Sequence, residues 1–412
     1  MKQDWEIKKL GEVCDLQNGF AFKSTDYIEF SNTVNFRMSQ IRPGGGVDLE
    51  NNPKYLPDEY AITYKDYLLK EGDIVIAMTD MATETKILGV PTIVPSDSRN
   101  WLLNQRVGKL FNIDKSKVNI AFLKYILVSE PINEYYKKLG RGGLQINIGK
   151  QDILNAKIPL PPLPEQQRIV SILDETFAAI AKAKANAEQN LKNAKELFES
   201  YLQGVFENGD WEIKVLNEIT EVKDGTHDSP KYIKEGIPFV TQKNIKPDGL
   251  TLADTKFITD QDHEKFYKRS NVAYGDILIS MIGANRGMAA IVDDKRTFSI
   301  KNVGLIKECE LVNMSFLLYY LKSPNAQKYV ADSSNGGAQE FVGLRALRSF
   351  PISLPPLKEQ QTIVSQLDAL RAETQKLEVV YQKKIADLEE LKKSILQKAF
   401  AGELKTEKAV AI

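Results

Sequence analysis

The sequence predicts an α+β protein in which two similar mixed α/β domains are joined by two long antiparallel coiled-coil helices. Three observations predict this architecture. A proline-rich motif occurs twice, short apolar runs bounded by turn residues precede each copy, and a long heptad pattern follows each copy. One globular domain and one helix are therefore encoded twice, which makes the chain a pseudo-twofold internal repeat.

The repeated motif reads LPPLPEQQRIVSILDE at residues 160–175 and LPPLKEQQTIVSQLDA at residues 354–369. Other segments repeat in the same order, beginning with WEIKKLGEV from Trp5 and WEIKVLNEI from Trp211. The spacing between matching segments shrinks in small steps, as loop insertions and deletions in a duplicated domain produce. These repeats predict a first domain over 1–160, a first helix over 161–209, a second domain over 210–354, a second helix over 355–404 and a tail over 405–412.

Each predicted domain contains short β-branched and aliphatic runs between glycine, proline, asparagine and aspartate. Such runs are typical of strands, and we expect strands at residues 73–77, 92–94, 276–279 and 290–292. The segment NQRVGKL from Asn104 matches IKNVGLI in the second half as a further part of the repeat. Denser apolar spacing predicts short helices over 119–129 and 314–322, each ending before a proline. Each half is therefore expected to be a mixed α+β domain with a curved sheet.

From Glu165 the pattern changes to heptads, in which apolar residues recur at alternating steps of three and four. A seam of this length indicates a coiled coil rather than a single surface helix, and Pro164 suits its first turn. The first seam is alanine-rich and the second carries larger side chains, so we expect close antiparallel pairing and a rigid spacer on the order of 60 Å long. The predicted seams are Ile169, Leu173, Thr176, Ile180, Ala183, Ala187, Asn190, Ala194, Leu197 and Tyr201, and Ile363, Leu367, Leu370, Thr374, Leu377, Tyr381, Lys384, Leu388, Leu391 and Ile395.

The composition limits the classes of function. Lys plus Arg equals Asp plus Glu at 55 each, so any nucleic-acid surface must be local. No apolar run approaches the roughly 18 residues that indicate a membrane span, and the first residues lack a signal-peptide core. The repeat does not match Cys14 to Cys309, which argues against a disulfide framework or a metal site. We expect a cytoplasmic protein with no membrane partner.

Two segments resemble catalytic motifs without completing them. PDGLTLADTK at 247–256 has the residue types of a metal-dependent nuclease, but a turn at Pro247-Asp248-Gly249 is the simpler interpretation. NNPKY at 51–55 lacks the second proline of an amino-methyltransferase signature.

The remaining chemistry also argues against catalysis. The two histidines, His227 and His263, offer little for a metal centre or an activated nucleophile, and His227 is expected in a structural or DNA-facing turn. No phosphate-binding glycine loop with its lysine occurs. The sequence therefore predicts no catalytic residue, no metal ligand and no cofactor bound by this chain.

Polar and basic residues on loops between the strands are the candidates for DNA contact. Arg pairs with guanine, Asn or Gln with adenine, and Lys with phosphates, although the same residue types also cap turns. Two glycine pairs, each followed by a glutamine, add a close approach of backbone to backbone, or alternatively a plain tight turn. The candidates are Arg37, Gln40, Arg42, Gln105, Arg106, Arg141 and Gln145 in the first half, and Gln242, Lys243, Asn244, Asn285, Arg286, Lys301, Asn302 and Gln339 in the second.

The chain resembles the specificity subunit of a type I restriction-modification enzyme. The resemblance rests on the duplicated LPPLPEQQRIV and LPPLKEQQTIV, the two WEIK openings, DGTH at 224–227, GDIVIAM and GDILISM, and GGAQ at 336–339. It implies that each globular half is a target recognition domain that reads one half of a split, asymmetric DNA sequence, while the paired helices set the gap. Lys358 departs from Pro164 of the first copy, and Ala21 stands where the second half has His227.

The resemblance also implies the partners. Two methyltransferase subunits would dock on this chain, restriction subunits would add cleavage, and S-adenosylmethionine, ATP and Mg would belong to those partners. Two other classes remain open: a structural protein whose domains and coil organise an assembly without DNA, and a fused nuclease or methyltransferase. Salt separates the first alternative from DNA binding, because phosphate contacts weaken steeply as salt is added.

Overall fold

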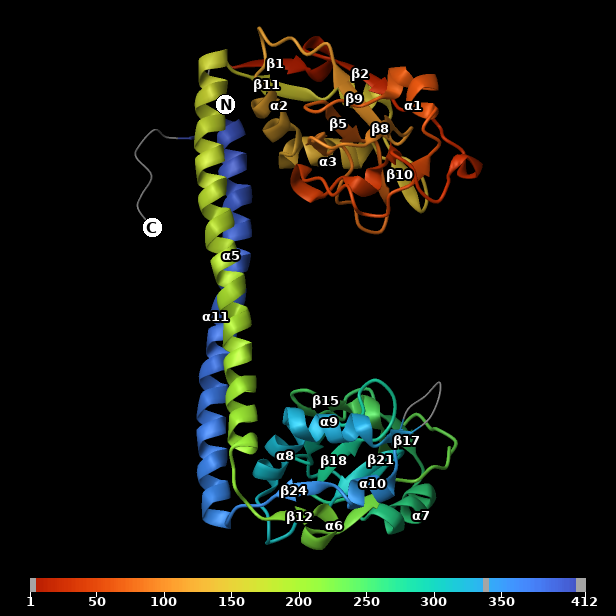
Figure 1. Cartoon of the computed structure of the whole chain (residues 1–412), viewed down its shortest axis with the longest axis vertical. Helices are drawn as coiled ribbons and strands as arrows, with labels where there is room; N and C mark the ends of the chain where they lie inside the picture. The colour runs from red at the N-terminus through yellow and green to blue at the C-terminus, as the bar shows by residue number, and fades with distance from the viewer. Residues whose placement is uncertain (1–4, 336–340, 405–412) are drawn as a thin grey trace. The chain divides into compact units, whose positions relative to one another are not determined.

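The computed structural model describes residues 5–335 and 341–404 (Figure 1). It divides into two compact units, Met1–Ala185 with Lys384–Ile412 (unit 1) and Asn186–Lys383 (unit 2). Each unit contains a globular domain, here domain 1 and domain 2, and one end of each long helix, α5 (Leu163–Glu207) and α11 (Leu357–Ala401). The predicted fold class of two similar α+β domains with two long helices is confirmed.

Domain 1 is built on two main sheets. The larger has the order β2-β9-β5-β7 and is antiparallel throughout, and the smaller has the order β4-β3-β8, with β3 and β8 parallel. Two short pairs, β1-β11 and β10-β6, complete the domain. The strands are β1 (Glu6–Lys9), β2 (Asp15–Asn18), β3 (Thr33–Phe36), β4 (Tyr55–Leu56), β5 (Ile74–Ala77), β6 (Thr79–Met81), β7 (Pro91–Ile93), β8 (Asn100–Leu103), β9 (Val107–Phe111), β10 (Gln145–Asn147) and β11 (Lys157–Leu160).

Strand β5 shows why the domain forms layers. Ile74 and Ile76 pack in the cluster that includes the helix residue Phe122, whereas Val75 on the opposite face packs with Phe36 of the smaller sheet. Because successive side chains of a strand alternate between faces, a strand buried on both faces reads as a continuous apolar run. The helices on the outer face are α2 (Ile120–Leu127), α3 (Glu130–Leu139) and α4 (Lys150–Leu154), and α1 (Tyr60–Thr63) precedes β5.

Domain 2 repeats this topology. Its larger sheet has the order β13-β21-β18-β19, and its smaller sheet has the order β17-β14-β20, again with one parallel pair, β14 and β20. The pairs β12-β24, β15-β16 and β22-β23 are short. The strands are β12 (Ile213–Val215), β13 (Val222–Asp224), β14 (Ile237–Val240), β15 (Ile245–Lys246), β16 (Gly249–Leu250), β17 (Lys256–Ile258), β18 (Ile277–Ser280), β19 (Ala289–Ile291), β20 (Ser299–Ile300), β21 (Val303–Ile306), β22 (Ser334–Asn335), β23 (Phe341–Val342) and β24 (Pro351–Ser353).

The helices of domain 2 are α6 (Leu216–Ile219), α7 (Asp260–Ser270), α8 (Met314–Lys322), α9 (Pro324–Asp332) and α10 (Leu344–Arg348). The predicted strands at 276–279 and 290–292 correspond to β18 and β19, and the predicted helix at 314–322 is α8. The sequence prediction missed the other helices of both domains, which are α1, α3, α4, α6, α7, α9 and α10. In α3 and α9 the proline that ends the preceding helical pattern occupies the first turn of a second helix, where its missing N–H costs nothing.

The repeated motif anchors each domain to a long helix through a buried glutamine. In unit 1, Gln166 accepts a hydrogen bond from the backbone N–H of Asn119 at 2.8 Å and donates to the carbonyls of Lys117 at 2.8 Å and Pro161 at 2.7 Å. Its exposed fraction is 0%. Asn119 is the N-cap of α2, so one amide joins the first turn of α5 to the start of a core helix.

Unit 2 repeats the anchor. Gln360 accepts from the backbone N–H of Asn313, the N-cap of α8, at 2.7 Å and donates to the carbonyl of Pro355 at 2.8 Å. A tyrosine on the same core helix then binds an aspartate on the long helix, Tyr125 to Asp174 at 2.5 Å in unit 1 and Tyr319 to Asp368 at 2.6 Å in unit 2. Burial and the nearby carboxylate raise the pKa of both phenols.

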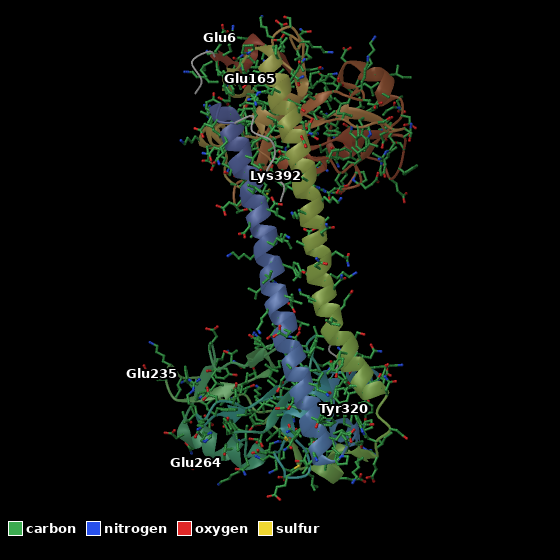
Figure 2. All side chains as sticks on the ribbon, turned by 90° about the vertical axis from the view of Figure 1, so that its left-hand side faces the viewer. Glu6, Glu165, Glu235, Glu264, Tyr320 and Lys392 are labelled. Carbon is green, nitrogen blue, oxygen red and sulfur yellow. The ribbon has the colours of Figure 1, made fainter. Side chains whose placement is uncertain are left out.

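The other long helix contributes its last turns to each domain core, which confirms antiparallel pairing within each unit. Phe400 near the end of α11 packs against Phe122 of α2, and Phe206 near the end of α5 packs against Phe316 of α8. Figure 2 shows Glu165 on α5 and Lys392 on α11, in the parts of these helices that belong to unit 1. Lys392 lies over the ring of Phe177 at 5.2 Å.

The heptad prediction is correct near the motif and at Ile180, Ala187, Ala194 and Thr374, which are buried, and it is wrong at other positions further along. Ile169, Leu173, Ile363 and Leu367 are buried as expected, but Leu197 and Tyr201 are 52% and 40% exposed, and Leu377 and Leu391 are 41% and 39% exposed. The residues buried instead at the helix ends are Leu202, Phe206, Ala399 and Phe400. They face a globular domain as well as the other helix, so the buried stripe follows the domain rather than a strict heptad.

No helix within the described residues is long and apolar enough to cross a membrane.

Replacing the anchoring glutamine tests its structural role. We expect Gln166→Ala to lower the free energy of unfolding by about 2 kcal/mol or more, because the N–H of Asn119 and two carbonyls lose their partner. Gln167→Ala is the matched control, since Gln167 is exposed in the same motif. Urea unfolding of both variants measures the difference, and equal losses would contradict the anchor.

Candidate nucleic-acid interface

The carboxyl ends of two parallel strands meet at one edge in each domain. The polar turns that follow β3 and β8 are therefore neighbours, and so are those that follow β14 and β20. A backbone hydrogen bond joins each pair of turns: the N–H of Asn104 donates to Phe36 O at 3.0 Å, and that of Lys301 donates to Val240 O at 2.9 Å. We call this region the strand-end edge of each domain.

A third segment closes onto this edge through a glycine. A Cβ on Gly19 would lie 2.1 Å from the carbonyl oxygen of Asn104, and one on Gly225 would lie 2.3 Å from that of Ile300. The next residue then pairs with the edge, since the N–H of Phe20 donates to Leu103 O at 2.8 Å and that of Thr226 donates to Ile300 O at 3.0 Å. Glycine is needed at both positions because any side chain would collide with backbone.

The hydrogen bonds correct the sequence alignment of this edge. Asn104 and Lys301 donate to equivalent strands, and Gln105 and Asn302 donate to the carbonyls of Phe20 and Thr226. Gln105 therefore corresponds to Asn302, and Arg106 is an additional residue in the turn of domain 1. The ungapped match of NQRVGKL with IKNVGLI was wrong by one residue here, because a turn between paired strands accepts an insertion that the strands do not.

The strand-end edge of domain 2 borders a cavity of about 720 Å³. Five of the predicted DNA-contact residues line it: Gln242, Lys243, Asn244, Lys301 and Asn302. Lys246 and Lys256 also line it, so four lysines face one carboxylate, that of Asp254. Such a concave surface attracts anions and offers amide groups beside the lysines.

The cavity wall combines charge with aromatic surface. The ammonium of Lys256 lies 4.2 Å from the centre of the Tyr232 ring, and Phe239 lines the same cavity. Lys301 donates to the hydroxyl of Ser229, which fixes one lysine near the rim. Gln242 accepts from the hydroxyl of Ser280 at 3.3 Å through its amide oxygen.

Three predicted DNA-contact residues have internal partners instead. Gln40 is 0% exposed and bonds the N–H of Arg37 and the carbonyl of Asn51, both at 2.8 Å. Asn244 is 6% exposed and accepts from the N–H of Thr241 at 2.9 Å. Both close a short 3-10 turn, η3 (Met38–Gln40) or η6 (Gln242–Asn244).

Arg42 is the third of these residues. It binds Asp48 at 2.6 Å and the carbonyl of Ser39 at 3.0 Å. The hydrogen bond from Arg42 holds the pKa of Asp48 below its ordinary value. Gln40 and Arg42 therefore have structural roles, and Asn244 fixes the turn that presents Gln242 and Lys243.

The other predicted residues lie on turns of their domains. Gln105 and Arg106 are exposed at the strand-end edge of domain 1, where the neighbouring Arg37 is half-buried. Arg141 and Gln145 lie on the hairpin around Gly142, whose φ of +138° and close contact with its own hairpin support the tight turn. Arg286 bonds Ser334 at 2.9 Å, Asn285 is exposed beside it, and Gln339 with the pair Gly336-Gly337 lies outside the described residues.

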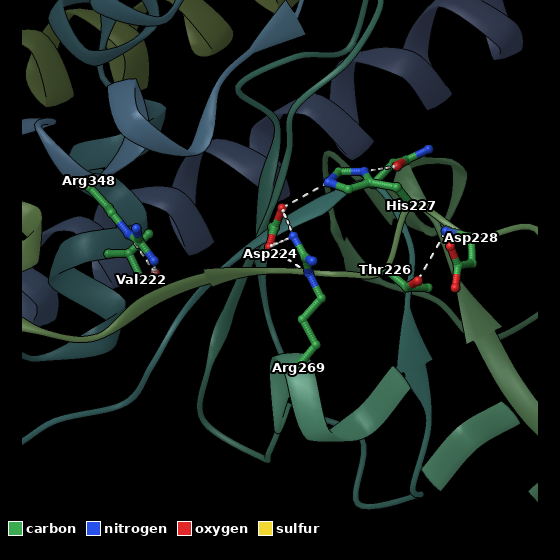
Figure 3. Close-up of polar contacts among 8 residues, drawn as sticks. Val222, Asp224, Thr226, His227, Asp228, Arg269 and Arg348 are labelled. Carbon is green, nitrogen blue, oxygen red and sulfur yellow. Dashed lines mark hydrogen bonds and ion pairs between the residues drawn. The ribbon is translucent and has the colours of Figure 1, made fainter. Parts of the chain in front are cut away.

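Sequence reasoning did not assign Lys246, Lys256 or Tyr232 to this surface, because they come from a hairpin, a strand and a loop that only the fold brings to the edge. It noted His227 without a partner. In the structure His227 bonds Asp224 and Asn302, and Arg269 from α7 bonds the same aspartate (Figure 3). The DGTH segment at 224–227, which begins at the end of β13, was the available signal.

Domain 1 has different chemistry at the same edge. Phe20 lies where domain 2 has Thr226, and its ring packs 4.5 Å from Tyr64 and 5.0 Å from Phe22. This aromatic cluster contrasts with the lysines of domain 2. Two edges with the same backbone therefore present different side chains.

The two segments that resemble nuclease and methyltransferase motifs do not form catalytic sites. Pro247 and Asp248 form the two-residue turn of the β15-β16 hairpin, which confirms the simpler interpretation. Asn51 accepts with its backbone carbonyl from Gln40 and lies in a loop before β4. Within the described part of the chain, no group of three or more His, Cys, Asp or Glu is placed to hold a metal ion.

Comparison with known proteins gives a consistent result. Residues 2–192 and 208–387 match the family described as the type I restriction modification DNA specificity domain. The type I restriction enzyme EcoBI specificity subunit of Escherichia coli is 24% identical over 433 residues, covering 97% of this chain and 86% of that protein. The MjaVIII specificity subunit of Methanocaldococcus jannaschii is 32% identical over 203 residues, or 49% of this chain and 46% of that protein.

Solved structures share the fold along the whole chain. A chain from a study of complex assembly and conformational transition of the type I R-M system has a TM-score of 0.74 at 22% identity, covering 98% of this chain and 99% of that one. The HsdS subunit from Thermoanaerobacter tengcongensis has a TM-score of 0.58 at 22% identity, with 98% of each chain covered.

The glycine contact predicts a sharp substitution effect. Gly19→Ala should lower the free energy of unfolding by about 2 kcal/mol or more, because the new Cβ meets backbone that cannot move aside. Gly143→Ala is the control, since a Cβ there meets nothing within 4 Å. Tryptophan fluorescence during urea unfolding reports both, and a neutral Gly19→Ala would disprove the close approach.

Proposed function

Because the chain belongs to the type I restriction modification DNA specificity family, we propose that its strand-end edges read the two halves of a bipartite, asymmetric DNA sequence. The chain is the specificity subunit of such a system and is not its catalytic part. The observation that carries the proposal is the domain 2 cavity, in which four lysines and the amides of Gln242 and Asn302 lie together. Lysines suit phosphates, and amides suit base edges in the major groove.

Domain 1 would read the other half with different residues. Gln105 and Arg106 are exposed at its edge, and Arg106 has no counterpart in domain 2. An arginine can bind guanine through two hydrogen bonds, whereas the amides of domain 2 suit other bases. The difference between the edges supports an asymmetric target.

The long helices support two further proposals. Each runs without interruption from one unit into the other, which supports a role in setting the gap between the half-sites. In unit 2 the exposed Leu197 and Tyr201 line a shallow hollow with Ala369 and Leu370. We propose that two methyltransferase subunits dock on such helix faces.

The partners would supply the remaining activities. Restriction subunits would join the complex, and S-adenosylmethionine, ATP and Mg would bind to the partners rather than to this chain. A cytoplasmic location is part of this proposal, because type I restriction and modification act on the DNA of the cell.

The lysines should govern affinity rather than base preference. We expect Lys243→Ala, Lys246→Ala and Lys256→Ala each to weaken duplex binding by a similar factor for all sequences, and to reduce the slope of log affinity against log salt by about one. Salt titrations by fluorescence anisotropy, on the full chain with its methyltransferase partners, measure this. Lys268→Ala on the exposed face of α7 is the control, and an unchanged slope in all three variants would refute lysine–phosphate contact.

The amides should govern sequence. Gln242→Ala should relax base preference in one half-site and Gln105→Ala in the other, with a loss of about 1–3 kcal/mol of discrimination per base pair. Sequencing methylated bases in a host that carries each variant shows which positions change. If Gln242→Ala altered both half-sites alike, or neither, the assignment of domain 2 to one half-site would fail.

A further inference from the structure

His227 and Asn302 form a coupled pair at the strand-end edge of domain 2. Nε2 of His227 lies 3.1 Å from Oδ2 of Asp224, and Nδ1 lies 2.7 Å from Oδ1 of Asn302 (Figure 3). Arg269 donates to both oxygens of Asp224 at 2.7 and 2.8 Å, so this buried carboxyl group is held in place. The imidazole is therefore held between two oxygen atoms.

The protonation state of the His227 imidazole is linked to the orientation of the Asn302 amide. A neutral imidazole has one N–H, and an imidazolium has two. If Nε2 donates to Asp224, the Nδ1 atom of a neutral ring has a lone pair that faces Asn302. This lone pair favours the NH2 of the Asn302 amide, rather than its carbonyl oxygen, next to Nδ1. A protonated ring favours the carbonyl, and Oδ1 of Asn302 is the atom 2.7 Å from Nδ1 of His227.

The backbone leaves the amide as the group that can respond. Asn302 has φ +51°, a left-handed conformation that asparagine tolerates, and its N–H donates to Thr226 O at 3.1 Å. Thr226 in turn donates to Ile300 O at 3.0 Å. Rotation of the amide about its last bond changes which atom faces the cavity without moving the main chain.

Charged groups from each neighbouring segment surround the imidazole. Asp224 of β13 and Arg269 of α7 pair with each other, and Asp228 pairs with Lys265 of α7 at 2.8 Å. Lys301, next to Asn302, donates to Ser229. Asp224 is the charge in direct contact with the ring, and it favours an N–H at Nε2.

We propose that His227 is a positioning residue that sets which end of the Asn302 amide is presented to DNA, an inference that rests on the proposed DNA-reading role of this edge. With His227 protonated, the NH2 of Asn302 faces outward and selects acceptors such as guanine O6 and N7 or thymine O4. With His227 neutral, the carbonyl faces outward and selects donors such as adenine N6 or cytosine N4.

Domain 1 provides an internal control. By the match of sequence and hydrogen bonds, Asn18, Ala21 and Gln105 stand where domain 2 has Asp224, His227 and Asn302. No imidazole lies at that place in domain 1. The half-site that domain 1 reads should therefore not depend on this titration.

The experiment selects bound duplexes from a randomised pool with the full chain at pH 5.5 and pH 8.0. Imidazole groups change charge between pH 5 and 8, so we expect one position of one half-site to shift its preferred base by about tenfold, while the other half-site stays constant. Asn302→Ala should remove the preference at that position. His227→Gln should keep the high-pH preference at both pH values, because its NH2 donates to Asp224 and its carbonyl oxygen faces Asn302 at any pH.

Each other outcome rejects a stated part of the idea. A His227→Gln variant that shifts with pH like the parent protein, or a shift that is lost in His263→Gln, would overturn the role of His227. A bipartite target without any pH-dependent position would overturn the coupling alone. Failure to select any sequence in either half-site would overturn the proposed function as well. Circular dichroism of each variant separates these results from misfolding.

Discussion

The buried amides of Gln166 and Gln360 are the constraint on which the two units depend. Each amide joins the first turn of a long helix to the start of a core helix. Because both side chains are buried, an amide that lost these partners would be left without hydrogen bonds. The tyrosine and aspartate pairs one or two turns later fix the direction of the helix. The repeated motif is therefore a joint, and each reading domain is fixed to its helix through it.

Within each domain, backbone hydrogen bonds build a strand-end edge of the same form. Parallel strand pairs bring two turns together, and Gly19 or Gly225 lets a third segment approach the backbone. None of these contacts depends on the side chains of the turns, so those side chains are free to differ. This separation explains how one duplicated fold presents an aromatic edge in domain 1 and a lysine-lined cavity in domain 2.

Of the candidate residues chosen by type, some are exposed at the strand-end edge and others are held in turns by internal hydrogen bonds. Gln242, Lys301 and Asn302 line the cavity, while Gln40 closes a buried turn. A glutamine has the same donors and acceptors in both roles, so residue type alone does not separate them. Lys256 was missed because its strand, β17, reaches the cavity only through its pairing with β14.

The sequence by itself determined the duplication, the four predicted strands and the presence of two long helices, because these follow from local periodicity and from a motif that is repeated. Tertiary structure decided which polar side chains share a surface and which residues of the long helices are buried outside the predicted heptad positions. It also brought His227 into contact with Asn302. Those outcomes depend on contacts between residues far apart in the chain, which local patterns do not encode.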